Sequence, residues 1–194
     1  MWLLVLGLLL FLGVHSVRIV ADGWRTRGIA RLGAGRWKGL YALLSLLGLA
    51  LIVWGWALAR RQPVVWWVPP AGLRHLNALF TLAAFVLLAA AYVPGNLVKA
   101  RLRHPMVLGV ALWALGHLLA SGSGAGLLLF GAFLLWALLD WRAAMRRDRA
   151  QGTAAPPGRW GATLLTLLVG ALAWVAFAFW LHAAWIGVAP LGAL

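Results

Sequence analysis

Residues 2–21 read WLLVLGLLLFLGVHSVRIVA, and this stretch decides what kind of fold the chain can adopt. The run has about the 20 residues that an α-helix needs to cross the hydrocarbon of a bilayer. Within it stand a histidine, a serine and an arginine, at His15, Ser16 and Arg18. Polar groups lose their hydration in hydrocarbon, so each of these side chains is expected to have a partner or a function.

The composition of the whole chain agrees with a membrane-spanning protein. Of its 194 residues, 64% are hydrophobic and 10% are charged, whereas a soluble domain is about one quarter charged. The formal net charge is +14, from 17 Lys and Arg against 3 Asp and Glu. The basic residues stand in short connections between apolar blocks, where anionic lipid headgroups explain them without nucleic acid. The chain has no cysteine, which excludes disulfides, thiolate metal sites and cysteine nucleophiles.

Six apolar segments predict an all-α fold, an integral membrane bundle of about six transmembrane helices that forms a single domain over residues 1–194. The expected spans are 2–21, 37–59, 72–92, 105–120, 126–141 and 160–187. The fourth and fifth spans are short, and SGSGAG between them is typical of a tight turn. RQPVVWWVPPAG (61–72) predicts a non-helical loop in the outer headgroup layer, and RRDRAQGTAAPPG (146–158) predicts a polar cytoplasmic linker.

The distribution of basic residues predicts the orientation of the bundle. The connections after the first, third and fifth spans hold 13 Lys and Arg, and those after the second and fourth hold 3. Positive residues favour the cytoplasmic side of a membrane. Both termini are therefore expected on the periplasmic side of a bacterial inner membrane.

The sequence offers few residues for hydrolytic or proton-transfer chemistry. Asp22, Asp140 and Asp148 are expected at or beyond the ends of spans, which argues against a catalytic carboxylate pair or a proton relay across the membrane. No phosphate-binding glycine loop, HExxH motif or Gly-x-Ser-x-Gly elbow is present. The 23 glycines are better explained by close packing of helices in lipid.

The five histidines are the main candidates for a site. Neutral imidazole is a good ligand for haem iron, and two histidines from different helices can hold haem in a membrane bundle. His75 and His182 are expected near the outer interface, where hydrogen bonds to headgroups explain them. His104, in RLRHPM, precedes a proline that suits the first turn of a helix, so a structural role and a role in the site both stay open.

His15 and His117 are expected inside the membrane, where a buried imidazole bonded to one backbone carbonyl is the structural alternative to a metal ligand. Trp113, four residues before His117, shares its helix face. Arg18, three residues after His15, either snorkels to the cytoplasmic headgroups or pairs with a propionate in a cofactor site. From the rise of a helix, His117 is expected further out than His15. The two rings therefore meet only if helix tilt, or a fourth helix that starts deeper on the cytoplasmic side, closes the gap.

Four stretches of the sequence carry a family resemblance. They are FLGVHSVRI (11–19), AYVPGNL (91–97), RHPMVLGVALWALGHLLASG (103–122) and LLLFGAFLLWALLDWR (127–142). Together they resemble the NnrU family of bacterial inner-membrane proteins, and the His-Pro followed by Trp-x-x-x-His is the most specific element. The resemblance is strong up to about residue 145 and weak in the last helix. It implies a link to denitrification, in particular to nitrite and nitric oxide reductase function.

The same domain is similar to the membrane part of zeta-carotene isomerases, which are haem b proteins that isomerise a cis double bond of a carotenoid. Carried over by motif, this similarity implies haem b with His15 and His117 as the iron ligands. The isomerases have a cysteine three residues before the second histidine, implicated in ligand switching, where this sequence has Ala114. A switch that uses this thiol is therefore absent here.

Three functions stay open from the sequence. The first is a haem b protein that supports nitrogen-oxide respiration by sensing, by electron transfer or as an accessory protein, with nitric oxide as a candidate partner. The second is a haem-dependent isomerase of an apolar isoprenoid in the bilayer. The third is a membrane scaffold without catalysis, in which the histidines are structural.

The orientation can be tested with fusions to alkaline phosphatase, which folds to an active enzyme only in the periplasm. A fusion at the C-terminus is expected to be active. A fusion after Arg149, in the connection that follows the fifth span, is the matched control and is expected to be inactive. The reverse pattern of activity would contradict the predicted topology.

Overall fold

The computed structural model describes residues 1–191, and over that range it is built of helices without a strand. The elements are α1 (Trp2–Val20), α2 (Asp22–Leu32), α3 (Ala34–Ala59), α4 (Gly72–Tyr92), α5 (Leu97–Leu102), α6 (Pro105–Ala120), α7 (Gly124–Ala150), α8 (Trp160–Ala176), the π-helical turn η1 (Phe177–Leu181) and α9 (His182–Ile186). α8, η1 and α9 form one continuous helical segment. The helices α1, α3, α4, α7 and this segment are long and apolar enough to cross a membrane, and α6 is a shorter apolar helix. The prediction of an all-α membrane bundle is confirmed.

The bounds of α4 and α6 agree with the spans predicted from the sequence, whereas α7, the helix that contains the predicted fifth span 126–141, is longer than that span. α7 has 27 residues and continues to Ala150, so residues 146–150 of the predicted linker 146–158 are helical. The reason is local, because no Gly or Pro interrupts the chain from Trp141 to Ala150 and Ala, Arg and Met favour helix. The helix ends just before Gly152, which has a positive φ of 59°.

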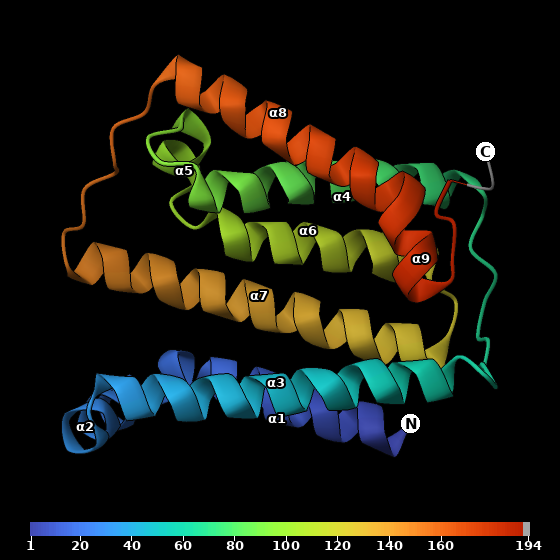
Figure 1. The fold of residues 1–194 in the computed structure, drawn as a ribbon, viewed down its shortest axis with the longest axis horizontal. Coiled ribbons are helices and arrows are strands. Elements are labelled where there is room, and N and C mark those ends of the chain that lie inside the picture. The colour runs from blue at the N-terminus through green and yellow to red at the C-terminus, as the bar shows by residue number, and fades with distance from the viewer. Residues whose placement is uncertain (192–194) are drawn as a thin grey trace.

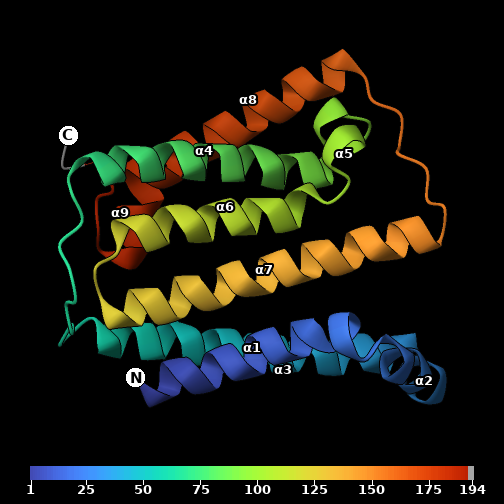
Figure 2. The same ribbon diagram turned by 180° about the vertical axis from the view of Figure 1, so that it is seen from behind.

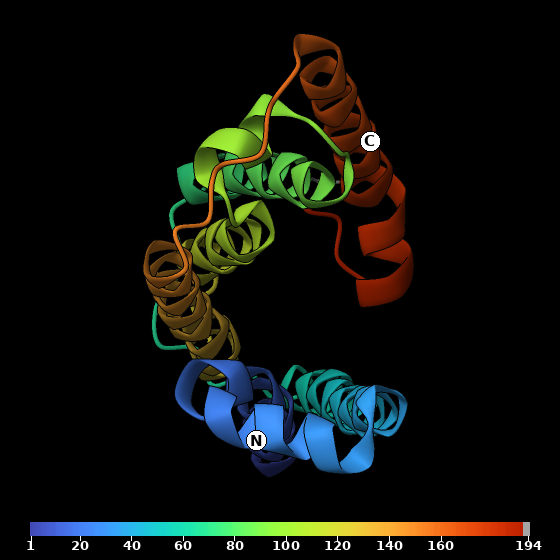
Figure 3. The same cartoon turned by 90° about the vertical axis from the view of Figure 1, so that its left-hand side faces the viewer.

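The helices form a curved row. Figure 3, which looks along the helices, shows an arc in which α3, α1, α7, α6, α4 and α8 follow one another, and each neighbouring pair is in contact. Figure 2 shows the same order from behind. At one end of the row Arg60, just after α3, donates a hydrogen bond from Nη1 to the carbonyl oxygen of Ile186 in α9 (2.7 Å). This bond links the two ends of the arc.

The N-terminus and the basic connections lie at opposite ends of the molecule (Figure 1). The N-terminus, α9 and the connection from α3 to α4 lie at one end, here named the terminal end. The short helices α2 and α5 and the connection from α7 to α8 lie at the other, here named the basic end. This arrangement agrees with the N-terminus and α9 on one side of a membrane and most of the positive charge on the other.

The connection from α3 to α4 is non-helical, as its sequence predicts. It pairs with the tight turn between α6 and α7, where the Trp66 amide donates to the Gly122 carbonyl oxygen (2.8 Å) and the Gly124 amide donates to that of Val64 (3.0 Å). These bonds satisfy backbone groups that no helix uses. They also fasten the start of α7 to the terminal end of α3.

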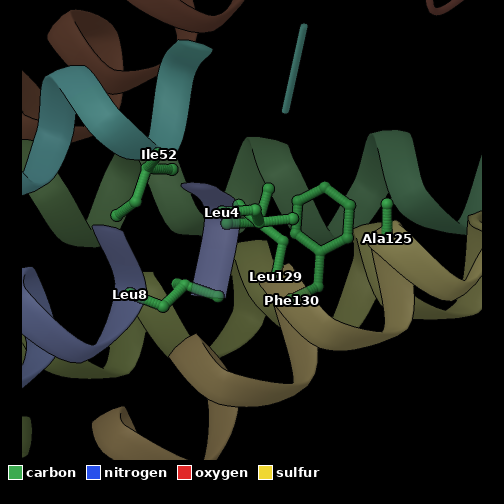
Figure 4. Packing of buried hydrophobic residues seen from close by; sticks show 6 residues of the cluster. All are labelled: Leu4, Leu8, Ile52, Ala125, Leu129 and Phe130. Carbon is green, nitrogen blue, oxygen red and sulfur yellow. The ribbon is translucent and has the colours of Figure 1, made fainter. Parts of the chain in front are cut away.

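Helices α1 and α3 pack with their backbones in close approach. Figure 4 shows the hydrophobic cluster at this contact, to which α7 adds three residues; its buried members are Leu4, Leu8, Ile52, Ala125, Leu129 and Phe130. A Cβ on Gly48 would lie 2.8 Å from the backbone nitrogen of Phe11, so only glycine fits there. In hydrocarbon, van der Waals contact at such close approach is a main source of helix association.

Substitution of Gly48 by alanine is expected to destabilise the α1–α3 pair by about 1–3 kcal/mol, because the added methyl must push two backbones apart. The matched control is Gly39→Ala in the same helix, where a Cβ meets nothing within 4 Å. This control is expected to be neutral or to gain up to about 1 kcal/mol from better helix propensity. Thermal unfolding in detergent measures both, and equal Tm values for the two variants would contradict the packing described.

Candidate functional site

His15 lies in the second half of α1 and is partly buried against α3 and α7. Its Nδ1 is 2.7 Å from the carbonyl oxygen of Phe11, one helical turn earlier. In a neutral imidazole, donation of Nδ1–H to this carbonyl leaves the lone pair on Nε2. The ring stacks on Phe11 with centroids 4.2 Å apart, and its centroid lies 5.2 Å from that of Tyr41 and 6.0 Å from that of Trp136.

His117 lies in the last turn of α6 and has the same local geometry. Its Nδ1 is 2.8 Å from the carbonyl oxygen of Trp113, again one turn earlier. The ring packs between Trp113 and Phe130, with centroid distances of 5.3 and 4.9 Å. Trp113 therefore shares the face of His117, as the spacing predicts. Within residues 1–191, no hydrogen bond occupies Nε2 of either His15 or His117.

A continuous row of aromatic rings connects the two histidines, but their own rings are not in contact. Phe11, under His15, lies 5.9 Å from Phe133 of α7, and Phe133 lies 5.5 Å from Trp113, which packs on His117. The structure thus brings both histidines to one aromatic cluster shared by α1, α6 and α7. It does not place the two imidazoles against each other.

The two histidines also differ in depth. His15 packs on Trp136 and His117 packs on Phe130, and these two α7 residues are six positions, or about 9 Å, apart along the helix. Since α7 starts at the terminal end, His117 lies nearer that end than His15. This order agrees with the depth expected from the sequence.

Two buried polar atoms without a hydrogen-bond partner in the described part of the chain lie beside these histidines. One is Nε1 of Trp136, whose ring contacts His15. The other is Oδ1 of Asn77 on α4, which lies against Gly116, the residue before His117. An unpaired buried polar group costs about 1–3 kcal/mol, so each is a candidate contact for a bound group. Neither residue was predicted as a site residue from the sequence, although each has a polar group within a predicted apolar span.

Arg18 lies three residues after His15 on α1 and lines a groove at the basic end of α1 and α7. The groove also contains Arg142, Arg146 and Arg147 of α7, and His15 is not among its lining residues. The carbonyl oxygen of Arg18 accepts a hydrogen bond from Nη1 of Arg147 (3.5 Å). The structure thus brings Arg18 together with the basic residues of α7.

His104 lies just before α6 at the basic end and is bonded to an acid. Its Nε2 is 3.1 Å from Oδ2 of Asp148, and Nη1 of Arg103 donates to the same oxygen from 3.2 Å. Arg103 holds a φ of 61°, which is uncommon for a residue other than glycine. These contacts fasten the start of α6 to the end of α7, which gives His104 a structural contact and separates it from the aromatic cluster.

The other two histidines lie at the terminal end. His75 is exposed in the first turn of α4. His182 is partly buried in α9, and its Nδ1 is 2.7 Å from the carbonyl oxygen of Val188. Neither position brings a ring into the aromatic cluster that holds His15 and His117.

Asn96, in the stretch AYVPGNL, connects the end of α4 to the start of α5 through its side-chain hydrogen bonds. Its side chain is buried, and Nδ2 donates to the carbonyl oxygens of Ala90 (2.9 Å) and Val93 (2.6 Å). Its Oδ1 accepts from the amide of Lys99 (2.7 Å), which caps α5. One side chain therefore closes the end of α4 and starts α5, and its role is structural.

The family comparison covers almost the whole molecule. The family model described as NnrU protein matches residues 3–190. The chain belongs to the NnrU family. No curated protein and no solved structure matches it. The NnrU assignment extends through α8 and α9, where the sequence motifs carried only a weak resemblance, so it applies to the whole arc of helices.

In this NnrU protein, the carboxylate of Asp148 on α7 binds Arg103 and His104, the two residues between α5 and α6. Partial burial alone would raise the pKa of its carboxyl, but the hydrogen bonds and charges of Arg103 and His104 outweigh this effect and hold the pKa below its usual 3.8. A carboxylate with a lowered pKa stabilises the fold above the unfolded-state pKa. That stabilisation is lost as the pH falls through the lower, folded-state value.

Asp148→Asn is therefore expected to lower the Tm at pH 7, and the difference from wild type should shrink as the pH falls below 3.8 and through the lower, folded-state pKa. Asp22→Asn is the matched control, because Asp22 only forms an exposed pair with Arg25 (3.6 Å) and is expected to change the Tm little. Thermal unfolding in detergent at the two pH values measures the effect. A loss that is the same at both pH values, or the same in both variants, would contradict the role of Asp148.

Proposed function

We propose that this NnrU protein binds haem b inside the membrane through His15 and His117 and uses it in nitrogen-oxide respiration. One observation carries the proposal: both intramembrane imidazoles bond Nδ1 to a carbonyl one turn earlier and leave Nε2 without a partner. In metal sites this outer hydrogen bond fixes the tautomer and orientation of a histidine ligand. The two histidines share this geometry although they lie on different helices.

The two imidazoles of His15 and His117 suit haem iron better than a metal ion that is held only by protein side chains. Among the described residues, no group of three or more His, Asp or Glu could hold a metal ion. Haem brings four nitrogen ligands of its own, so one or two imidazoles complete its coordination. The rings of Trp113, Phe133 and Trp136 supply flat apolar contacts near the histidines, and the free Nε1–H of Trp136 is a donor for a polar group of the cofactor.

A purely structural role for the histidines accounts for only part of this geometry. It explains the Nδ1 bonds to Phe11 and Trp113, which satisfy one polar atom of each ring. It leaves Nε2 of both rings, Nε1 of Trp136 and Oδ1 of Asn77 without a partner. A ligand near the aromatic cluster would give several of these atoms a partner at once.

Bound haem b would supply an iron that changes oxidation state and binds nitric oxide, which suits sensing, electron transfer or an accessory role beside nitrite and nitric oxide reductases in a bacterial inner membrane. The protein's own part is to present His15 and His117 from α1 and α6, with Trp113 packed beside the second ligand. No specific observation favours an isoprenoid isomerase. Position 114, which holds the cysteine in that enzyme, is a buried alanine here.

Absorption spectra of the protein purified from haem-replete cells test the proposal. Wild type is expected to show a Soret band and, when reduced, the sharp visible bands of haem with two imidazole ligands. His15→Ala and His117→Ala are each expected to lose most of the bound haem or to shift it to a high-spin spectrum. His75→Ala, an exposed histidine outside the cluster, is the matched control and should keep the wild-type spectrum.

Other outcomes would redirect or overturn the proposal. A colourless wild type with an unchanged Tm in all variants would contradict haem binding and favour a structural role. A spectrum that is lost in His104→Ala but kept in His117→Ala would move the second ligand to His104. Conversion of a cis-carotenoid by the purified protein would favour the isomerase. For the respiratory role, a denitrifying strain that lacks this protein should recover nitrite consumption with wild type but not with His15→Ala.

A further inference from the structure

The groove between the basic ends of α1 and α7 has a volume of about 510 Å³. Four of its lining residues are basic, namely Arg18, Arg142, Arg146 and Arg147, and one, Asp22, is acidic. The others are apolar, namely Ile19, Leu139 and Ala143. The groove is separate from the proposed haem site, because none of its lining residues belongs to the aromatic cluster.

The positive charge of the groove is largely unbalanced by the protein. Asp22, which also lines the groove, lies 3.6 Å from Arg25, and Asp140 lies 3.8 Å from Arg147. Within residues 1–191, no carboxylate lies within the 4.0 Å of an ion pair from Arg18, Arg142 or Arg146. Three guanidinium groups at one groove therefore have no ion-pair partner in the described part of the chain.

The arginines of the groove repel one another, and a bound anion would remove this repulsion. Arg142 and Arg146 are one turn apart on α7, and like charges at this spacing repel. Arg18 approaches from α1, and Arg147 already bonds to the carbonyl of Arg18. An anion between the helices would neutralise both sides of the groove, and planar guanidinium groups bind phosphate oxygens in pairs.

We propose that this groove binds the phosphate of an anionic membrane phospholipid, with an acyl chain against its apolar lining residues. The basic end faces the cytoplasmic headgroups in the predicted orientation, which places the groove at the depth of lipid phosphates. The unbalanced guanidinium groups select an anionic headgroup, because a zwitterionic lipid brings its own cation. The apolar residues Ile19, Leu139 and Ala143 favour a lipid over a soluble phosphate, which would leave them without an apolar partner.

Native mass spectrometry of the delipidated full-length protein with added lipid tests the proposal. Wild type is expected to retain phosphatidylglycerol in preference to phosphatidylcholine. The double variant Arg142→Gln/Arg146→Gln is expected to bind phosphatidylglycerol at least about tenfold more weakly. The matched control is Arg27→Gln/Arg31→Gln, which removes the same charge from exposed positions of α2 outside the groove. This control should bind phosphatidylglycerol like wild type.

Three results would overturn the proposal. Equal retention of phosphatidylglycerol and phosphatidylcholine would show that the groove does not select an anion. Equal weakening in the two double variants would show attraction by diffuse surface charge and not by the groove. Displacement of the lipid by millimolar inorganic phosphate would identify a soluble phosphate as the occupant. If the double variant does not fold, the single variants Arg142→Gln and Arg146→Gln carry the same comparison, with Tm as the measure of folding.

Discussion

The packing of aromatic rings from α7 between α1 and α6 is the contact on which the rest of the structure depends. Helices α1 and α6 are not neighbours in the arc, and both are positioned by α7. Phe130 contacts the ring of His117, while Phe133 bridges Phe11 and Trp113. A single helix thereby sets the relative positions of the two intramembrane histidines, and the aromatic cluster and the candidate site are one feature.

Hydrocarbon imposes a second constraint, because it offers polar groups no water. Several polar side chains of the apolar helices form a hydrogen bond within their own helix. His15 and His117 bond to carbonyl oxygens one turn earlier, and the Thr81 hydroxyl donates to the carbonyl oxygen of Asn77 (2.9 Å). Among the described residues, buried atoms without a partner occur in Ser45, Asn77 and Trp136, and those of Asn77 and Trp136 lie beside the two histidines. A ligand is expected beside the histidines because these buried polar atoms have no hydrogen-bond partner in the surrounding helices.

The polar chemistry of the molecule is divided by depth. Asp148 joins Arg103 and His104 at the basic end, and the groove at Arg18 gathers arginines at the same end. These contacts account for two residues that the sequence also allowed in a cofactor site. They leave His15 and His117, deeper in the bundle, as the pair whose free nitrogen atoms have no structural explanation.

The sequence by itself determined the fold class and the bounds of α4 and α6, because the length of an apolar run and its Pro and Gly neighbours act locally. It also determined that His15 and His117 are intramembrane and that Trp113 shares a face with His117, since helical period fixes both. The tertiary structure alone decided that His104 meets Asp148, that Arg18 joins the arginines of α7, and that α7 rings lie between the two histidines. Each of these contacts depends on which helices are neighbours in the arc, and helices far apart in the chain carry no local signal of their pairing.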